Sequence, residues 1–185
     1  MATLVPLYTA PTLTEPNQIQ EFLASRGVAF EVWPMPGEAL ALAGLRDPSP
    51  DDKARLLALF ADALRDKAET AGYRSADVVV IRPHFPQVEE ALARFDRVHF
   101  HDADEVRAIV GGEGLFGFVD DDGRQFEVRL QAGEYISLPA GMWHWFYCTA
   151  SRDVTALRLF RDEPAWVPHY RPTARGSVAP PKPAA

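Results

Sequence analysis

A succession of short β-type segments in the second half of the sequence limits most strongly what this chain can fold into. Each segment is an apolar or alternating run that ends at a turn signal, such as Asp120-Asp121-Asp122-Gly123. Strands this short and this evenly spaced are typical of an antiparallel barrel or sandwich. The predicted strands cover residues 98–101, 106–110, 115–119, 124–130, 135–138, 143–147 and 154–160.

The first half of the chain mixes helices with short strands, and we expect these to pack on the barrel. Ser49 as a cap, Pro50 at the first helical position and acidic residues in the first turn predict a helix. Its apolar stripe continues to about residue 70, and Gly72 ends it. Further helices are predicted over residues 16–26 and 85–94, and strands over residues 28–33 and 77–81.

The length of 185 residues suits one domain. We expect that domain to span residues 1–170, with an extension in residues 1–94 and the barrel core in about residues 95–165. Residues 171–185 are rich in Pro and Ala and are expected to be a disordered tail.

Charge and composition exclude several kinds of partner. The net charge of −7 argues against nucleic acid or an anionic membrane surface, because both attract positive proteins. No apolar stretch approaches the roughly 20 residues of a membrane helix, and the first residues do not form a secretory signal. With Cys148 as the one cysteine, no internal disulfide can form. A monomeric cytoplasmic protein is expected.

Four residues in the predicted barrel form a candidate metal site. His99 and His101 are two apart, so in a strand both imidazoles point to the same face. Glu105 follows after a turn, and His144 comes from a distant strand behind a Pro-Ala-Gly turn. Three imidazole nitrogens and one carboxylate suit Fe(II), Ni(II), Mn(II), Co(II) or Zn(II), and an octahedral ion would keep two positions open.

The alternative for each histidine is an ordinary packed or surface role. Three of the five histidines fall in this one pattern, however, which favours the metal site. His84 and His169 fit no ligand pattern, and for them the structural or surface role is preferred.

Two neighbouring features could shape the site. Arg107 lies two residues beyond Glu105, where a guanidinium on the inner face would favour an anionic substrate; a surface ion pair is the alternative. Alternation puts Phe146 on the same face as His144 and turns Trp143 and Trp145 to the opposite face. Core packing is the preferred role for most of these aromatic residues.

The motifs around these residues resemble a known family. The spacing His99-x-His101-x3-Glu105-x6-Gly112 resembles the first cupin motif, and Gly133-x5-Pro139-x-Gly141-x2-His144 resembles the second. The resemblance becomes closer in the segments HDADEVR (101–107), ISLPA (136–140), HWF (144–146), TALRLF (155–160) and GVAFEVW (27–33). These are similar to the acireductone dioxygenases, and the similarity extends to about Trp166.

The resemblance implies a fold and an activity. The fold would be a mainly β (α+β) cupin-type double-stranded β-helix, with the N-terminal helices and short strands packed on it. The activity would be O₂-dependent cleavage of 1,2-dihydroxy-3-oxo-5-(methylthio)pent-1-ene, an ene-diol of methionine salvage that ionises to a dianion. Iron would give formate and 4-methylthio-2-oxobutanoate, whereas nickel would give formate, carbon monoxide and 3-(methylthio)propanoate.

The resemblance also assigns residues. The metal ligands would be His99, His101, Glu105 and His144, holding one Fe(II) or Ni(II), and Arg107 would stabilise the substrate dianion. The residues that match substrate-pocket positions are Phe95, Phe146, Arg158 and Trp166. Asp104, beside Glu105, is retained. Val98 departs from the family, which commonly has an acid there that could help hold the ion.

Two other functions remain open from the sequence. One is a cupin dioxygenase that uses the same ligands on a different enol or diketone. The other is a non-catalytic metal-binding cupin for small-molecule sensing, which the complete ligand set disfavours.

Overall fold

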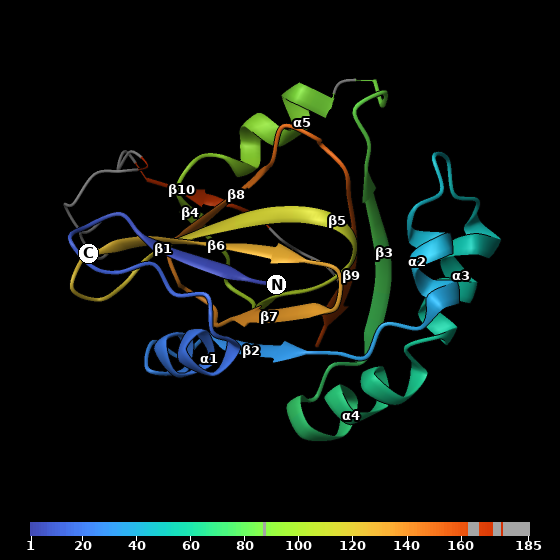
Figure 1. Cartoon of the computed structure of the whole chain (residues 1–185), viewed down its shortest axis with the longest axis horizontal. Coiled ribbons are helices and arrows are strands. Elements are labelled where there is room, and N and C mark those ends of the chain that lie inside the picture. The colour runs from blue at the N-terminus through green and yellow to red at the C-terminus, as the bar shows by residue number, and fades with distance from the viewer. Residues whose placement is uncertain (87, 163–166, 172–174, 176–185) are drawn as a thin grey trace.

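Two antiparallel sheets share one long strand in the computed structural model, which describes residues 1–86, 88–162, 167–171 and 175 (Figure 1). The shared strand is β5 (Glu105–Val119). Its first half pairs with β7 (Glu134–Leu138) and β9 (Val154–Phe160), and its second half pairs with β6 (Gln125–Gln131) and β8 (His144–Cys148). The fold is mainly β, and the predicted cupin-type barrel is confirmed.

Shorter strands extend both sheets. They are β1 (Thr3–Pro6) on β6, β2 (Ala29–Val32) on β7, β3 (Ser75–Ile81) on β9, β4 (His99–Phe100) on β8, and β10 (His169–Tyr170) on β4. Neither β1 nor β10 is predicted from the sequence.

The continuity of β5 corrects one prediction. Residues 106–110 and 115–119 are expected to be separate strands, but both belong to β5. The register against β9 shifts between Ile109 and Gly111, and Gly112 has a φ of 66°. A Cβ atom on Gly112 would lie 1.8 Å from the Asp153 carbonyl oxygen, so only glycine fits where the strand passes from one sheet to the other.

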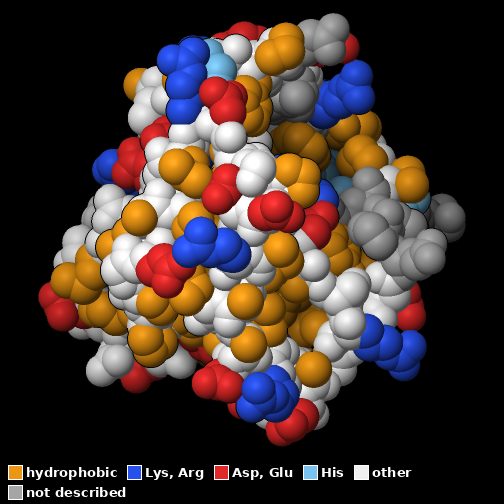
Figure 2. All heavy atoms as spheres, turned by 90° about the vertical axis from the view of Figure 1, so that its right-hand side faces the viewer, with side chains coloured by type: hydrophobic (Ala, Val, Ile, Leu, Met, Phe, Trp, Pro, Cys, Tyr) orange, Lys and Arg blue, Asp and Glu red, His pale blue; other side chains and the backbone are white. Residues whose placement is uncertain are grey.

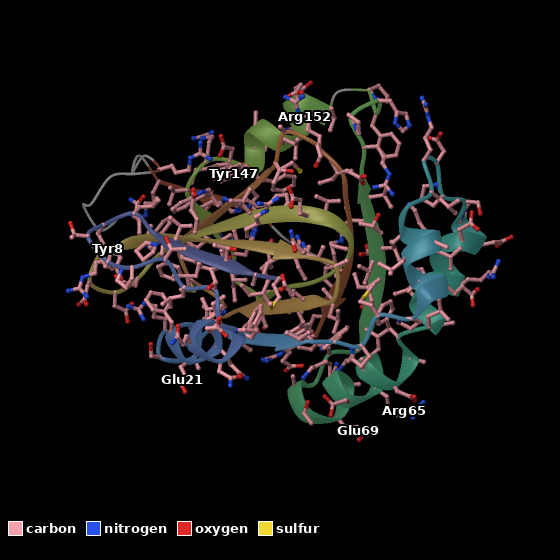
Figure 3. The ribbon with its side chains drawn as sticks, viewed as in Figure 1. Tyr8, Glu21, Arg65, Glu69, Tyr147 and Arg152 are labelled. Carbon is pink, nitrogen blue, oxygen red and sulfur yellow. The ribbon has the colours of Figure 1, made fainter. Side chains whose placement is uncertain are left out.

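The helices lie outside the barrel. They are α1 (Pro16–Ala24), α2 (Gly37–Ala43), α3 (Pro50–Ala58), α4 (Ala61–Ala71) and α5 (Val88–Phe95). Helices α2 to α4 lie on the side of β3, and their face carries apolar and charged side chains interspersed, with the basic ones scattered (Figures 1 and 2). Glu21 of α1 and Arg65 and Glu69 of α4 point to solvent (Figure 3).

The predicted helix from residue 50 to about 70 is wrong in one respect, because it is two helices. The predicted start is confirmed: the Ser49 hydroxyl accepts from the Asp52 N–H at 3.1 Å, and the Asp52 carboxylate accepts from the Ser49 N–H at 2.9 Å. The helix ends at Ala58, and Phe60, with φ −109° and ψ 16°, begins the next one. Phe60 is buried beside Trp33, so burial of this ring accompanies the break.

Two apolar cores lie on opposite faces of the sheet that contains β3, β9, β5, β7 and β2. The inner core fills the barrel between the sheets and includes Phe30, Ile109, Phe118, Ile136 and Ala156. The outer core lies under α2 to α4 and includes Leu42, Phe60, Val106, Ala108 and Leu157. The alternation of Val106, Ala108 and Val110 with Ile109 shows which side chains of β5 face the barrel interior.

Some predictions fall on parts of the chain that are not described. Trp166 and most of the expected tail, residues 172–174 and 176–185, lie outside the described residues. Within the described part of the chain, no helix is both long and apolar enough to cross a lipid bilayer.

The Arg82 side chain joins α2 to the barrel. It is 5% exposed and forms an ion pair of 2.9 Å with Asp153. Its guanidinium donates to the carbonyl oxygens of Ala43, Leu45 and Val154 and to the Thr155 hydroxyl. One side chain therefore satisfies the carbonyl groups at the end of α2 and at the start of β9.

Replacement of this guanidinium should destabilise the fold strongly. Arg82→Met removes the hydrogen bonds to three carbonyl oxygens and the ion pair with Asp153, so we expect a loss of about 3 kcal/mol or more in the free energy of unfolding. Urea denaturation followed by circular dichroism measures it. Arg74→Met is the matched control, because its 3.9 Å ion pair with Asp162 is exposed and should contribute less than about 0.5 kcal/mol. Similar losses in both variants would contradict this role of Arg82.

Candidate metal centre

The four residues of the predicted metal site come together in the barrel interior. His99 lies on β4 opposite His144 of β8, His101 follows β4, and Glu105 begins β5. One ligand atom from each lies within 4.8 Å of the others. All four side chains are buried, with 1 to 5% of each residue exposed. Among the described residues, neither His84 nor His169 belongs to the group, as expected.

Imidazole nitrogens and a carboxylate oxygen point toward one another within the group. The Nε2 atoms of His101 and His144 lie 3.1 and 3.0 Å from Glu105 Oε2. The other carboxylate oxygen, Oε1, lies 3.0 Å from Arg107 Nη2. The carboxylate thus meets the imidazoles through one oxygen and a guanidinium through the other.

Backbone carbonyl groups orient all three imidazoles. The Nδ1 atoms of His99 and His144 lie 2.6 and 2.8 Å from the carbonyl oxygens two residues earlier, those of Arg97 and Met142. The Nδ1 atom of His101 lies 3.3 Å from the Val167 carbonyl oxygen, which the chain supplies from 66 residues away. An N–H at Nδ1 leaves the Nε2 lone pair for an ion.

The protonation states also fit a cation. Burial lowers the pKa of His99 to about 4, and the charge of His144 lowers it as well. Burial raises the pKa of Glu105, but the charge of Arg107 and the contacts with His144 and His101 outweigh burial and hold it well below its usual range. At neutral pH, His99 is neutral and Glu105 is ionised, as metal ligands must be. Three imidazoles and a carboxylate in a buried group therefore fit a borderline divalent ion.

Arg107 lies on the inner face of β5, and its surface alternative is wrong. Its side chain is 13% exposed, and the acid that it contacts is the buried Glu105. Its neighbour across the sheet is Arg158 of β9, whose own neighbour is Asp77 of β3. Arg158 donates to Asp77 through Nε at 2.7 Å and through Nη2.

The aromatic residues divide as alternation predicts. Phe146 packs against the inner core, with its ring centroid 4.9 Å from that of Phe116. Trp145 and Trp143 belong to a separate apolar cluster on the opposite face of β8. A Cβ atom on Gly114 would lie 2.5 Å from the Phe146 ring, so the glycine makes room for this side chain. Phe95, at the end of α5, is 41% exposed.

Asp104 ties the ligand loop to the turn before His144. One carboxylate oxygen accepts the Ala140 N–H at 3.2 Å, and the other accepts from Tyr73 at 3.2 Å and from Arg161 at 2.9 Å. The Gly141 N–H donates to the His101 carbonyl oxygen at 2.9 Å, so two bonds connect the loop to the turn. Sequence reasoning singles out neither Tyr73 nor Arg161, because local patterns do not show contacts between distant segments.

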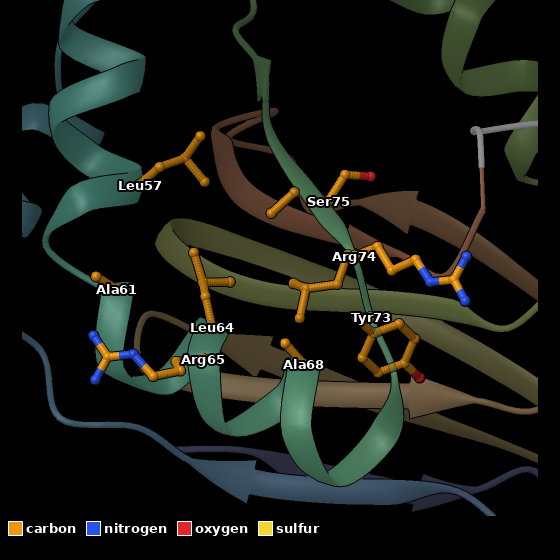
Figure 4. A pocket seen from close by; sticks show the side chains of 10 residues that line it. Leu57, Ala61, Leu64, Arg65, Ala68, Tyr73, Arg74 and Ser75 are labelled. Carbon is orange, nitrogen blue, oxygen red and sulfur yellow. The ribbon is translucent and has the colours of Figure 1, made fainter.

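A pocket of about 410 Å³ lies elsewhere, on the outer face of the sheet (Figure 4). Leu57 and Leu64 of α3 and α4 line it together with Leu159, and Tyr73 and Arg74 lie at one end. It contains none of the four clustered residues. The donor chemistry of the buried group, and not this apolar pocket, therefore marks the site.

The sequence of this chain matches a known protein family. The sequence profile of the ARD/ARD' family matches residues 40–168. This chain belongs to the ARD/ARD' family. It is 35% identical to the acireductone dioxygenase of Leptospira interrogans, over 92% of this chain and 96% of the relative. Its identity to that of Microcystis aeruginosa is 38%, over 92% and 93%.

A solved structure matches over nearly the same length. It is an acireductone dioxygenase from Bacillus anthracis with a cadmium ion in the active center. The two folds superpose with a TM-score of 0.84 at 32% identity, covering 92% of this chain and 98% of the other. Together with the buried four-residue group, this likeness supports one divalent metal in this ARD/ARD' family member.

Loss of the Asp104 carboxylate should weaken metal binding without removing a donor. Asp104→Ala frees the ligand loop from Ala140, Tyr73 and Arg161, and we expect the Co(II) dissociation constant to rise about 10- to 100-fold. Competition with a chromophoric chelator measures it. Asp102→Ala is the control in the same loop, because its carboxylate is 78% exposed and pairs with His169. Equal affinities of Asp104→Ala and the parent protein would reject this role.

Proposed function

We propose that this chain is an acireductone dioxygenase, which cleaves 1,2-dihydroxy-3-oxo-5-(methylthio)pent-1-ene with O₂ in methionine salvage. The observation that carries the proposal is the buried group of His99, His101, Glu105 and His144, with Arg107 on the carboxylate, in a member of this family. The relatives that share about a third of its residues over nearly their whole length carry that activity in their names.

The resident metal is proposed to be Fe(II) or Ni(II), held by the four residues. When bound, the ion would supply Lewis acidity and would help to orient an ene-diolate for reaction with O₂. Iron is proposed to give formate and 4-methylthio-2-oxobutanoate, and nickel to give formate, carbon monoxide and 3-(methylthio)propanoate. A monomeric state and a cytoplasmic location stay predictions.

The surrounding side chains are proposed to bind the anion and shape its pocket. The Arg107 guanidinium would offset the negative charge of the ionised ene-diol, which a buried cation does without reorganisation of solvent. Arg158, its neighbour across the sheet, would add a second cation on the same face. Phe146 would form an apolar wall, and Phe95 and Trp166 are proposed as further pocket residues. Asp104 would act through the loop that carries His101 and Glu105.

Reconstitution of the metal-free protein tests the activity and the metal together. The Fe(II) form should consume O₂ with acireductone and release the keto acid, and the Ni(II) form should release carbon monoxide. His144→Ala removes a ligand and should abolish metal retention and turnover, whereas His84→Ala should leave both unchanged, because His84 pairs with Asp47 and is not a member of the group. Full activity in a His144→Ala protein that retains its fold would refute the site. Absence of O₂ uptake with either metal would refute the function.

Substitution of Arg107 should separate anion binding from metal binding. Arg107→Met should retain the metal but lower kcat/KM by about 10²- to 10³-fold, the usual cost of losing one donor to developing negative charge. Arg107→Lys keeps the charge but loses the planar fork, so an intermediate value is expected. Steady-state kinetics with metal analysis on the same samples measures both effects. Unchanged kinetics in Arg107→Met would reject the role.

A further inference from the structure

Three charged residues form a row across the sheet beside the metal centre. Asp77 of β3 is the register partner of Arg158 of β9, which is in turn the partner of Arg107 of β5. The strands β3 and β9 lie side by side along one edge of the barrel (Figure 1). The row extends to Glu105, whose carboxylate contacts Arg107 at 3.0 Å.

The whole row faces the barrel interior. Val79, Ala156 and Ile109, each two residues from a member of the row, pack in or against the inner core. The residues that alternate with the row, Val78, Leu157 and Ala108, pack in the outer core under the helices. Asp77, Arg158 and Arg107 therefore share the face that carries the metal-binding group.

Each guanidinium contacts a carboxylate. Asp77 accepts from Arg158 with both oxygens, one of them from Nε at 2.7 Å, which is the bidentate geometry that fixes the plane of a guanidinium. Glu105, two residues before Arg107 on β5, contacts the Arg107 guanidinium. Two cations thus lie on register partners of neighbouring strands, and each pairs with an anion.

This arrangement needs a restraint on Arg158. Two like charges on directly opposed residues of paired strands repel each other. Burial lowers the pKa of Arg107, the charge of Glu105 raises it, and the charge of Arg158 lowers it further. The Arg107 side chain is 13% exposed, whereas the Arg158 side chain is 29% exposed. The bidentate contact with Asp77 opposes the movement of Arg158 toward solvent.

We propose that Asp77 is a positioning residue that holds Arg158 beside Arg107, so that the two guanidiniums form a paired site for the oxygen atoms of a dianion. This inference rests on the proposed function, because it assumes an anionic substrate at the metal centre. Asp77 itself touches neither the metal-binding group nor the substrate in this role. It acts through the orientation of one side chain.

The direction in which Asp77→Asn changes the affinity for a dianion separates this role from a simple effect of charge. Removal of a negative carboxylate makes the site more positive, so a purely electrostatic role predicts tighter binding of a dianion in Asp77→Asn. Loss of positioning predicts weaker binding, because Arg158 leaves the pair despite the added positive charge. Asp162→Asn is the matched control, since it removes the same charge from an exposed ion pair with Arg74.

The experiment titrates the full-length, Co(II)-loaded proteins with two probes and follows the visible absorption of the ion. Oxalate is a dianion that presents two pairs of oxygen atoms, and imidazole is a neutral ligand that reports on the ion alone. We expect Asp77→Asn to bind oxalate about 10-fold more weakly than the parent protein, which is the size of effect seen when a contact behind a metal ligand is lost. Its affinity for imidazole should equal that of the parent protein. Asp77→Glu should recover part of the oxalate affinity, and Asp162→Asn should match the parent protein.

Other outcomes overturn the proposal. Unchanged or tighter oxalate binding in Asp77→Asn would remove the positioning role, and equal weakening of oxalate and imidazole would assign the effect to the metal centre instead. With acireductone as substrate, KM should rise more than kcat falls. If the parent protein does not turn over acireductone, the proposed function fails, whereas the oxalate titration still decides the role of Asp77.

Discussion

The passage of β5 from one sheet to the other is the constraint on which the rest of the structure depends. Its first half carries Glu105 and Arg107, and its second half pairs with β8, which carries His144. Because the strand bends at Gly112, the two halves face each other across the barrel interior. Glu105 and His144, separated by 39 residues, therefore come within 3.0 Å through one continuous strand and its partner.

How much the sequence predicts depends on whether a feature is local. The two-residue spacing of His99 and His101 is enough to place both rings on one face, so the ligand group could be predicted. The apolar stripe of α3 and α4 is also local, but it continues across the break at Phe60 and so does not show where the first helix ends. The break accompanies burial of the Phe60 ring beside Trp33. Helix α2 lacks a side-chain cap and is held by its buried face, so its sequence gives little signal. The contacts of Asp77 and of the Val167 carbonyl join segments far apart in the chain, and no spacing rule predicts them.

The position of Val98 changes how its departure from the family is understood. Val98 is 2% exposed and packs with Val119 and Trp145 in the apolar cluster on the opposite face of β8 from His144. Because His99 points inward, residue 98 points to the opposite face of the sheet. An acid there would lie against an indole ring and not beside the ion, and would be costly to bury without a partner. In this chain, Val98 therefore completes an apolar cluster behind β4.

The charges of the site bear on how an acidic protein would bind the proposed anionic substrate. The chain carries a net charge of −7, so its overall field repels a negatively charged substrate. Within the row, however, the two carboxylates of Asp77 and Glu105 cancel the two guanidiniums of Arg107 and Arg158. A divalent ion held by neutral imidazoles would then leave the site with two positive charges, which the proposed dianion would neutralise and a neutral ligand would not. Since an uncompensated charge is costly in a buried site, the metal-loaded site would favour a dianion over a neutral ligand.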